Sequence, residues 1–366
     1  MHFVRLTTAG MDDWMRQKKD RTSVSCNLLI LSYAFPPSVG GIETVSLVLA
    51  RSFAQRGYDV TVATETGGDA RDGEEPFRVV RRPGALRLIA AIRRAEIVLQ
   101  SNISLRLGWP LWILFPRKPF VLVFHGPIAR PDGRVAWQDR LKRALLGRPY
   151  FLSVSRYQAE TIQPGSRVIR NPYDSETFRP LPQIERDQDL LFVGRLVTAK
   201  GVDTLLRAYA IVRKLRPKTT LAIVGAGPEE DALRTLAASL GIDPAAHFLG
   251  ARQGDDLACV MNRHRILVVP SRSVPPEACP VVPVEAIACG CVPVASRMGG
   301  LPESVGEAGV LFEEGNAEEL AGTLLGLLDA PEKLDAYRAR AESHLRQFQI
   351  DTVIDAYEAH FAACRR

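Results

Sequence analysis

The feature of this sequence that most constrains its fold is a unit that recurs along the chain. Each unit is a short apolar run, then a loop rich in glycine or proline, then a helical segment. In the first half, the apolar runs cover 27–33, 59–63, 77–80, 97–100, 119–124 and 150–154. The alternation restarts in the second half, with runs at 189–193, 221–224, 247–250, 266–269 and 292–295. Helices are expected after it, at about 317–328 and 331–348. Strands that alternate with helices predict parallel sheets, and the restart predicts two α/β domains.

Length and composition set the expected domain boundaries and compartment. The 366 residues exceed one ordinary core, so we expect a loose extension at 1–25, domains at 26–182 and 183–348 joined near 180–186, and a terminal helix at 349–366. The N-terminal residues lack the apolar segment of a secretory signal, and the longest apolar run, 109–115, is too short to span a bilayer. Six cysteines without a regular spacing predict reduced thiols in a cytoplasmic protein.

Charge is distributed unevenly between the two halves. Residues 1–182 carry 27 Lys and Arg against 16 Asp and Glu, whereas residues 183–366 carry 20 against 25. The basic residues of the first half gather near two expected helices: Arg78, Arg81, Arg82, Arg87, Arg93 and Arg94, then Arg140, Lys142, Arg143 and Arg148. Such segments either lie on an anionic membrane surface or are ordinary solvated helix faces. No nucleic-acid partner is expected.

Neither the cysteines nor the histidines have the spacing of metal ligands. Cys289 and Cys291 flank one glycine, which is not the two-residue spacing of a zinc site, and they are better interpreted as small buried hydrophobes. The six histidines form no pair at a helical spacing of four. We therefore expect no bound metal and no cofactor.

Two acids stand in the unit from Ser271 to Glu303. An apolar run ends at Val269, a proline-rich loop carries Glu277, and a helix expected at 282–288 carries Glu285 after seven intervening residues. This order places both acids at the carboxyl edge of a parallel sheet, where open α/β folds bind ligands. Taken singly, such an acid more often belongs to a solvated loop or a polar helix face. The apolar neighbours of Glu285 instead predict a carboxyl group that needs a polar partner.

Three further loops combine glycine with basic or small residues after a strand. Gly194, Arg195 and Lys200 lie between the strand at 189–193 and the helix expected at 202–215, an arrangement suited to an anion. A solvated basic loop is the alternative. Gly225 and Gly227 precede another helix, and Gly40-Gly41 precedes the helix expected at 42–56; either pair also fits a tight turn.

A histidine ends one of the buried strands. His125 follows the apolar run at 119–124, which places it at the carboxyl tip of a predicted strand. A lone histidine in this position is more often structural than functional. The residues alone leave its role open.

Taken together, these segments resemble the retaining, nucleotide-sugar-dependent glycosyltransferases of family 4. The resemblance rests on the E-x7-E pair with its G-G-x-P-E continuation, the G-R-L-x-x-x-K-G loop and the P-P-x-x-G-G-x-E loop at 36–43. It covers about 26–364, and is strongest over 189–303. It implies the GT-B fold, which consists of two Rossmann-like domains facing across a cleft, with a C-terminal helix that returns to the first domain.

The resemblance also implies roles for individual residues. His125 and Glu277 would face the donor sugar, and Arg195 and Lys200 would stabilise the departing diphosphate without a metal ion. Donor binding would involve Glu285 on the nucleotide ribose, together with Gly40, Gly41, Gly194, Gly225, Gly227 and Ser271. The partners would be a nucleotide-sugar donor and a glycan or lipid-linked acceptor, with an anionic membrane surface as a further candidate.

The chain departs from the family pattern at two places. Ala278-Cys279-Pro280 replaces the glycine-containing segment after the first acid, and Pro172 replaces the glycine of the P-N-G-V-D turn. Pro280 has no N–H to offer a hydroxyl or phosphate group. The implied function is sugar transfer from a nucleotide diphosphate donor, with retention, in glycan or glycolipid synthesis. The alternative is a non-catalytic nucleotide-sugar-binding or scaffold protein; a nucleotide-sugar epimerase lacks the E-x7-E pair.

Overall fold

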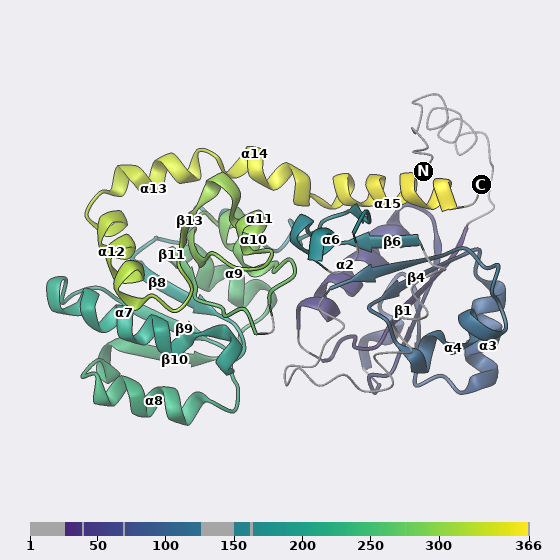
Figure 1. Cartoon of the computed structure of the whole chain (residues 1–366), viewed down its shortest axis with the longest axis horizontal. Coiled ribbons are helices and arrows are strands. Elements are labelled where there is room, and N and C mark those ends of the chain that lie inside the picture. Colours follow the sequence, from purple (N-terminus) through teal and green to yellow (C-terminus); the bar gives the residue numbers. More distant parts are fainter. Residues whose placement is uncertain are drawn as a thin grey trace. The chain divides into compact units, whose positions relative to one another are not determined.

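The chain forms two compact units. The computed structural model describes residues 26–38, 40–68, 70–125, 150–161, 164–274 and 276–364, and its elements are labelled in Figure 1. Within those ranges the first unit contains 26–124, 150–152 and 351–364, and the second contains residue 125 and 153–350. The expected extension at 1–25 and the basic residues Arg140, Lys142, Arg143 and Arg148 lie outside the described residues.

The first sheet has the strand order β3-β2-β1-β4-β5-β6-β7. Its strands are β1 (Asn27–Ser32), β2 (Asp59–Thr64), β3 (Arg78–Arg81), β4 (Ile97–Ser101), β5 (Phe120–Phe124), β6 (Tyr150–Ser153) and β7 (Arg167–Val168). The pairs β2–β3, β1–β2, β1–β4 and β4–β5 are parallel. Leu28 to Leu31 are buried without alternation, as is typical of parallel strands covered on both faces. The strand order reverses its direction between β1 and β4.

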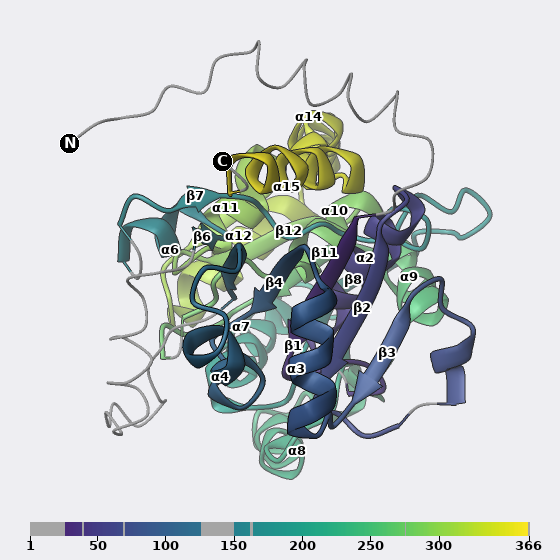
Figure 2. The same cartoon turned by 90° about the vertical axis from the view of Figure 1, so that its right-hand side faces the viewer.

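The helices of this part of the chain are α2 (Gly41–Gln55), η1 (Ala70–Gly73), α3 (Ala85–Arg94), α4 (Leu105–Ile113), α6 (Arg156–Thr161) and α15 (Ile350–Cys364). α3 and α4 lie side by side over the sheet (Figure 2). α15 packs on α2, where the rings of Phe53 and Phe361 stack with centroids 5.5 Å apart. Arg56, which follows α2, also pairs with Asp351 at 2.8 Å and Asp355 at 2.7 Å.

The second sheet has the order β10-β9-β8-β11-β12-β13. Its strands are β8 (Gln188–Val193), β9 (Leu221–Val224), β10 (Ala246–Gly250), β11 (His264–Val269), β12 (Val292–Ser296) and β13 (Val310–Phe312). All its neighbouring pairs are parallel. In chain order this is the 3-2-1-4-5-6 arrangement of a Rossmann fold, with its switch point between β8 and β11.

The second sheet is covered by helices whose apolar faces form the core of this unit. They are η3 (Thr198–Lys200), α7 (Val202–Leu215), α8 (Glu230–Ser239), η4 (Asp243–Ala245), α9 (Gly254–Arg263), α10 (Val282–Ala288), α11 (Leu301–Val305), η5 (Gly306–Ala308), α12 (Ala317–Leu328), α13 (Pro331–Arg338), α14 (Ala341–Leu345) and η6 (Arg346–Phe348). Val202, Leu205, Tyr209 and Val212 recur at helical spacing on α7 and are buried in that core.

The structure agrees with most of the expected elements and corrects one of them. The helix bounds expected at 202–215, 282–288 and 317–328 are those observed. A single helix expected over 331–348 is wrong, because α13, α14 and η6 occupy this range. The segment at 180–186, where we expected the two domains to join, makes hydrogen bonds within the second unit: Leu181 N–H donates to Asn262 Oδ1 at 2.8 Å, and Arg186 donates to the Cys289 carbonyl at 2.7 Å.

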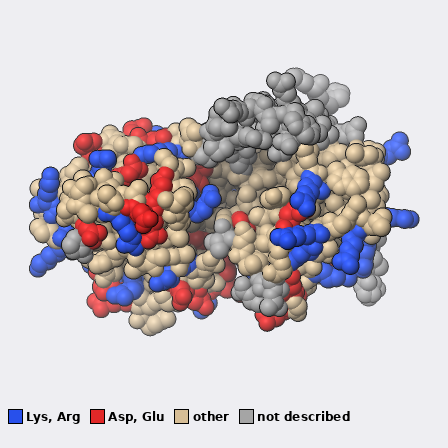
Figure 3. All heavy atoms as spheres, turned by 90° about the horizontal axis from the view of Figure 1, so that it is seen from below, with Lys and Arg blue, Asp and Glu red and all other residues tan. Residues whose placement is uncertain are grey.

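The charge asymmetry is visible on the surface but is smaller than the arginine count suggests. Figure 3 shows Lys and Arg predominating on one face of the first unit, whereas both signs are interspersed over the second. Three of the six arginines expected to form a basic patch are paired: Arg81 with Asp72, and both Arg78 and Arg94 with Asp59. The expected cluster is therefore partly neutralised by acids that sequence inspection did not assign to it.

Candidate functional site

The candidate site lies at the switch point of the second sheet. The loop after β8 runs from Gly194 to Gly201, and the loop after β11 runs from Pro270 to α10. Because β8 and β11 are adjacent and parallel, these loops leave the same edge of the sheet. In a doubly wound fold this switch point is the place where ligands bind, outside the carboxyl ends of the strands.

An ion pair joins the two loops. The Lys200 ammonium contacts Glu277 Oε1, and both side chains are only partly exposed, at 25% and 19%. Ser271 Oγ donates to the same Glu277 oxygen at 3.0 Å. Sequence analysis assigned these three residues to one site, and the structure brings them into contact.

Backbone contacts between the loops surround this ion pair. Arg272 N–H donates to the Ala199 carbonyl at 2.8 Å, and the Arg272 guanidinium pairs with Asp203 of α7 at 2.6 Å. Gly201 has φ of +62°, and a Cβ added there would lie 2.0 Å from the Pro270 carbonyl oxygen. Sequence analysis missed the Arg272–Asp203 pair, because the spacing of two residues on different loops carries no signal before the strand order is known.

The Gly-Gly turn after β12 supports the backbone of Glu277. Gly300 N–H donates to the Glu277 carbonyl at 2.8 Å. A Cβ added at Gly299 would lie 2.3 Å from that carbonyl oxygen, and one at Gly300 would lie 1.8 Å from the Ala278 carbonyl oxygen. The two glycines therefore allow one loop to pass closely under the acid that the other loop presents.

The remaining glycines of the second unit have an evident packing role. A Cβ added at Gly225 would meet the Gly194 carbonyl oxygen at 1.8 Å, and one at Gly227 would meet the Leu196 carbonyl oxygen at 2.3 Å. Gly194 borders the Phe192 ring and the Lys200 side chain. These glycines let the loops after β8 and β9 lie against each other, whatever contacts they make with a ligand.

Arg195 is exposed at the start of the loop after β8. Within the part of the chain that the structure describes, its guanidinium makes no hydrogen bond or ion pair. A guanidinium in this state can grip the oxygens of a phosphate through two parallel hydrogen bonds.

Glu285 is buried in the first turn of α10, with a relative exposure of 6%. Burial raises the pKa of its carboxyl group to about 8, and the charge of Asp174 adds to the effect. No hydrogen bond or ion pair among the described residues involves this carboxyl group. The expectation that Glu285 needs a polar partner is thus not met by the protein itself, and a buried acid without one is costly.

His125 directly follows β5, and its contacts assign it to the second unit. Burial lowers its pKa to about 4, whereas interaction with the Asn171 side chain acts in the opposite direction. The imidazole is therefore neutral near pH 7. Asn171 also donates to the Cys279 carbonyl at 3.0 Å, so it links His125 to the loop that carries Glu277. Sequence analysis did not single out Asn171.

Gly40 and Gly41 belong to the first unit, at the start of the other switch-point helix, α2. Gly40 has extended backbone, and a Cβ added there would meet Glu43 Oε2 at 2.5 Å, the far end of a flexible side chain. A Cβ at Gly41 would meet nothing within 4 Å. The protein's own packing thus gives no strong reason for either glycine.

Metal clusters and membrane-spanning helices are both absent from the described residues. These residues contain no group of three or more His, Cys, Asp or Glu placed to hold a metal ion. In the same ranges no helix combines the length and the apolar character that crossing a membrane requires.

Family models match most of the chain in two adjoining segments. The model described as Glycosyltransferase Family 4 matches residues 39–177, and the one described as Glycosyl transferases group 1 matches residues 174–344. Solved structures share the fold: that of Anabaena HepE in complex with UDP and glucose has a TM-score of 0.78 and 22% identity, covering 92% of this chain and all of that one. The two Rossmann-like units therefore form a GT-B fold, and the chain belongs to family 4 of the glycosyltransferases.

Two relatives illustrate the range of similarity. D-inositol 3-phosphate glycosyltransferase of Rhodococcus opacus is 34% identical over 249 residues, which is 63% of this chain and 55% of that protein. The chain thus spans about half the length of this relative. GDP-mannose-dependent alpha-(1-6)-phosphatidylinositol monomannoside mannosyltransferase of Mycolicibacterium smegmatis is 27% identical over 356 residues, covering 84% of this chain and 91% of that protein.

Proposed function

We propose that the protein transfers a sugar from a nucleoside diphosphate donor to an acceptor hydroxyl, with retention at the anomeric carbon. The observation that carries this proposal is the state of Glu285. Its buried carboxyl group has no protein partner within the described chain, and it lies at the sheet edge that also presents the Lys200–Glu277 pair. Ligand hydroxyl groups, such as those of a ribose, would supply the missing donors.

The basic residues of the loop after β8 suit the leaving group. Breaking the bond between sugar and diphosphate builds negative charge on the diphosphate, and stabilising such charge usually contributes most to catalysis. Arg195 is exposed and unpaired in the described chain. Lys200 lies just before α7, whose N-terminal dipole also favours an anion. These groups would neutralise the diphosphate without a metal ion or another cofactor.

The Lys200–Glu277 ion pair would exchange partners when the donor binds. A diphosphate attracts the Lys200 ammonium more strongly than one carboxylate does, and Glu277 would then be available to the hydroxyls of the donor sugar. His125 would contribute a neutral imidazole near the same sugar, since its pKa of about 4 keeps it uncharged. Ser271 and the supporting glycines would hold Glu277 in place.

For the acceptor we propose a glycan or lipid-linked molecule that bears an anionic group. The two relatives described above are named for inositol phosphate and phosphatidylinositol mannoside acceptors. In this chain, Arg106 pairs with Glu65 at 3.0 Å and Arg82 donates to the Glu65 carbonyl at 3.3 Å. Both arginines are exposed near the carboxyl edge of the first sheet, where they would meet a phosphate.

Peripheral contact with an anionic membrane is part of this proposal. Arg87 and Arg93 of α3 are exposed and make no ion pair in the described chain, and the exposed Leu86 adjoins them. Vesicles containing anionic lipid should therefore co-sediment the protein at low salt and release it at high salt. The double variant Arg87→Glu/Arg93→Glu should bind less. Equal sedimentation with neutral vesicles would contradict this part.

Transfer is tested by incubating the full chain with UDP-glucose or GDP-mannose and either inositol 3-phosphate or a phosphatidylinositol extract. The anomeric configuration of any product is then read by NMR. A product with the configuration of the donor supports retaining transfer, and the opposite configuration would contradict it. Donor binding without transfer to any acceptor, and without hydrolysis, would favour the non-catalytic donor-binding alternative.

A further inference from the structure

The loop after β1 occupies the switch point of the first sheet. It runs from Tyr33 to Gly40 and leads into α2. The neighbouring segment after β2 holds its first half: Phe35 N–H donates to Thr66 Oγ1 at 3.0 Å, and Thr64 Oγ1 donates to the Tyr33 carbonyl at 3.2 Å. The Phe35 ring is buried against Phe77.

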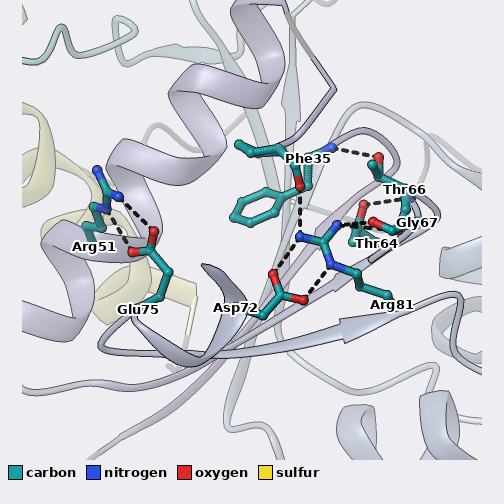
Figure 4. Close-up of polar contacts among 9 residues, drawn as sticks. Phe35, Arg51, Thr64, Thr66, Gly67, Asp72, Glu75 and Arg81 are labelled. Carbon is teal, nitrogen blue, oxygen red and sulfur yellow. Dashed lines mark hydrogen bonds and ion pairs between the residues drawn. The ribbon is translucent and has the colours of Figure 1, made fainter. Parts of the chain in front are cut away.

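The guanidinium of Arg81 also holds the loop after β1 against the loop after β2. Arg81, at the end of β3, donates from its terminal nitrogens to the Pro36 carbonyl at 2.8 Å and the Gly67 carbonyl at 2.7 Å. The same guanidinium donates two hydrogen bonds of 2.6 Å to the carboxylate of Asp72 in η1. Figure 4 shows Arg81 between Asp72 and these backbone oxygens, with Phe35 beside them. Arg81 therefore joins the loop after β1, the loop after β2 and η1.

The burial of Arg81 separates it from an ordinary surface ion pair. Its side chain is only 11% exposed, and the Asp72 side chain is 31% exposed. A planar fork with five N–H donors can serve three segments at once, whereas the single ammonium of lysine cannot span them. Loss of Arg81 would leave the Pro36 and Gly67 carbonyls without this donor and Asp72 without its partner.

We propose that Arg81 and Asp72 form a positioning pair that holds the loop after β1 in its working conformation. This rests on the proposed function, because the loop carries Gly40 and Gly41 into the start of α2. The pair does not touch the reacting atoms. Its effect falls on turnover, because the loop must be in place when the donor and acceptor react, and a small displacement of a positioning element lowers the rate steeply.

The chain offers a matched control in the same unit. Arg51 donates to Glu75 through two hydrogen bonds of 2.8 and 2.7 Å, and Figure 4 shows this pair apart from Arg81. The Arg51 side chain is 48% exposed, and its bonds to Glu75 join α2 to the segment before β3. Arg51→Met removes a bidentate ion pair of the same chemistry without removing a hydrogen bond to Pro36 or Gly67.

The test compares Arg81→Met, Arg81→Lys, Asp72→Asn and Arg51→Met by hydrogen–deuterium exchange and by kinetics. In both Arg81 variants we expect at least tenfold faster exchange in the peptide covering 33–41, with exchange in 28–31 unchanged. Asp72→Asn should give a smaller increase, and Arg51→Met none. If Arg81→Lys exchanges as fast as Arg81→Met, the planar guanidinium is required and a positive charge alone is not sufficient.

Turnover of UDP-glucose or GDP-mannose should fall at least tenfold in the Arg81 variants, with Kd for UDP or GDP changed less than threefold. The Kd should be preserved because Lys200, Glu277 and Glu285 all belong to the second unit. Unchanged exchange at 33–41 would overturn the proposal, as would equal effects in Arg51→Met. A wild-type protein that shows no transfer would instead refute the proposed function. The exchange experiment would still test, independently of activity, whether Arg81 holds the loop after β1.

Discussion

The ammonium of Lys200 forms an ion pair with the carboxylate of Glu277, which joins the loop after β8 to the loop after β11. Each residue also has a separate support: Lys200 ends η3, and Glu277 accepts a hydrogen bond from Ser271 at 3.0 Å. The two charges are therefore held at the switch point before any ligand arrives. Such preorganisation is what electrostatic catalysis requires.

Replacing Lys200 by methionine should weaken nucleoside diphosphate binding while leaving the fold intact. A charge-assisted hydrogen bond to phosphate contributes about 1.5–3 kcal/mol, so Kd should rise by roughly tenfold to a hundredfold. Isothermal titration with UDP and GDP measures this. The exposed Lys214 at the end of α7 is the control, and Lys214→Met should bind normally. Equal losses in both variants would show that general charge, not the site, is responsible.

Nucleotide affinity should depend on the ionisation of Glu285. Its pKa of about 8 leaves the free carboxyl group mostly protonated at pH 7, whereas ligand hydroxyls donate best to the ionised form. Binding should then release a proton, and Kd should fall by roughly fivefold as pH rises from 7 to 8. Glu285→Gln should abolish this dependence. Because the nucleotide ionises in the same way in both experiments, its own pH dependence cancels in the comparison. Parallel pH profiles in the two proteins would contradict the assignment.

The same group makes a prediction for the protein without ligand. Because the folded-state pKa is raised from 4.5 to about 8, the folded state holds the proton more tightly than the unfolded state. Its contribution to the free energy of unfolding should fall as pH rises from about 4.5 to about 8, by on the order of 2–4 kcal/mol. Urea unfolding of wild type and Glu285→Gln at pH 5 and pH 8 checks this. Relative to wild type, the variant should gain stability at pH 8.

Gly201 should be much less tolerant of alanine than Gly241. Both have positive φ, at +62° and +70°, but only at Gly201 would the new Cβ meet backbone, 2.0 Å from the Pro270 carbonyl oxygen. The conformation alone costs about 1 kcal/mol for alanine. Gly241→Ala should therefore lower the free energy of unfolding by about that much. Gly201→Ala should lower it distinctly more and should also lose nucleotide binding. Chemical unfolding measures both, and similar losses would mean that the two loops are not tightly joined.

The sequence predicted the fold and most site loops because those features are local. Apolar runs, glycines and helix starts determine strands and helices, and strand ends in a parallel sheet determine where loops gather. Ser155 and Gln158 show how far this extends: their spacing is that of a capping box, and Gln158 N–H donates to Ser155 Oγ at 3.2 Å. The resemblance to a family then ordered the loops into one site.

What the sequence could not give are pairings between distant segments. Arg81 was counted as one of six surface arginines, yet it is largely buried against Asp72 and backbone carbonyls. The Arg272–Asp203 contact and the link from Asn171 to the Cys279 carbonyl were likewise invisible. Each depends on which loops the sheet order brings together, and no spacing along the chain encodes that. The roles of the site residues toward a ligand remain proposals.

The central claim is a metal-independent nucleotide site in the second unit, and thermal unfolding with ligands tests it most directly. UDP, GDP, ADP and their common sugar conjugates are added in the presence of EDTA, since a ligand that binds only the folded state raises Tm. We expect one nucleotide to raise Tm in wild type and in Arg207→Ala, an exposed arginine of α7, but not in Arg195→Ala. No rise with any nucleotide, or a rise only after Mg²⁺ or Mn²⁺ is restored, would contradict this claim.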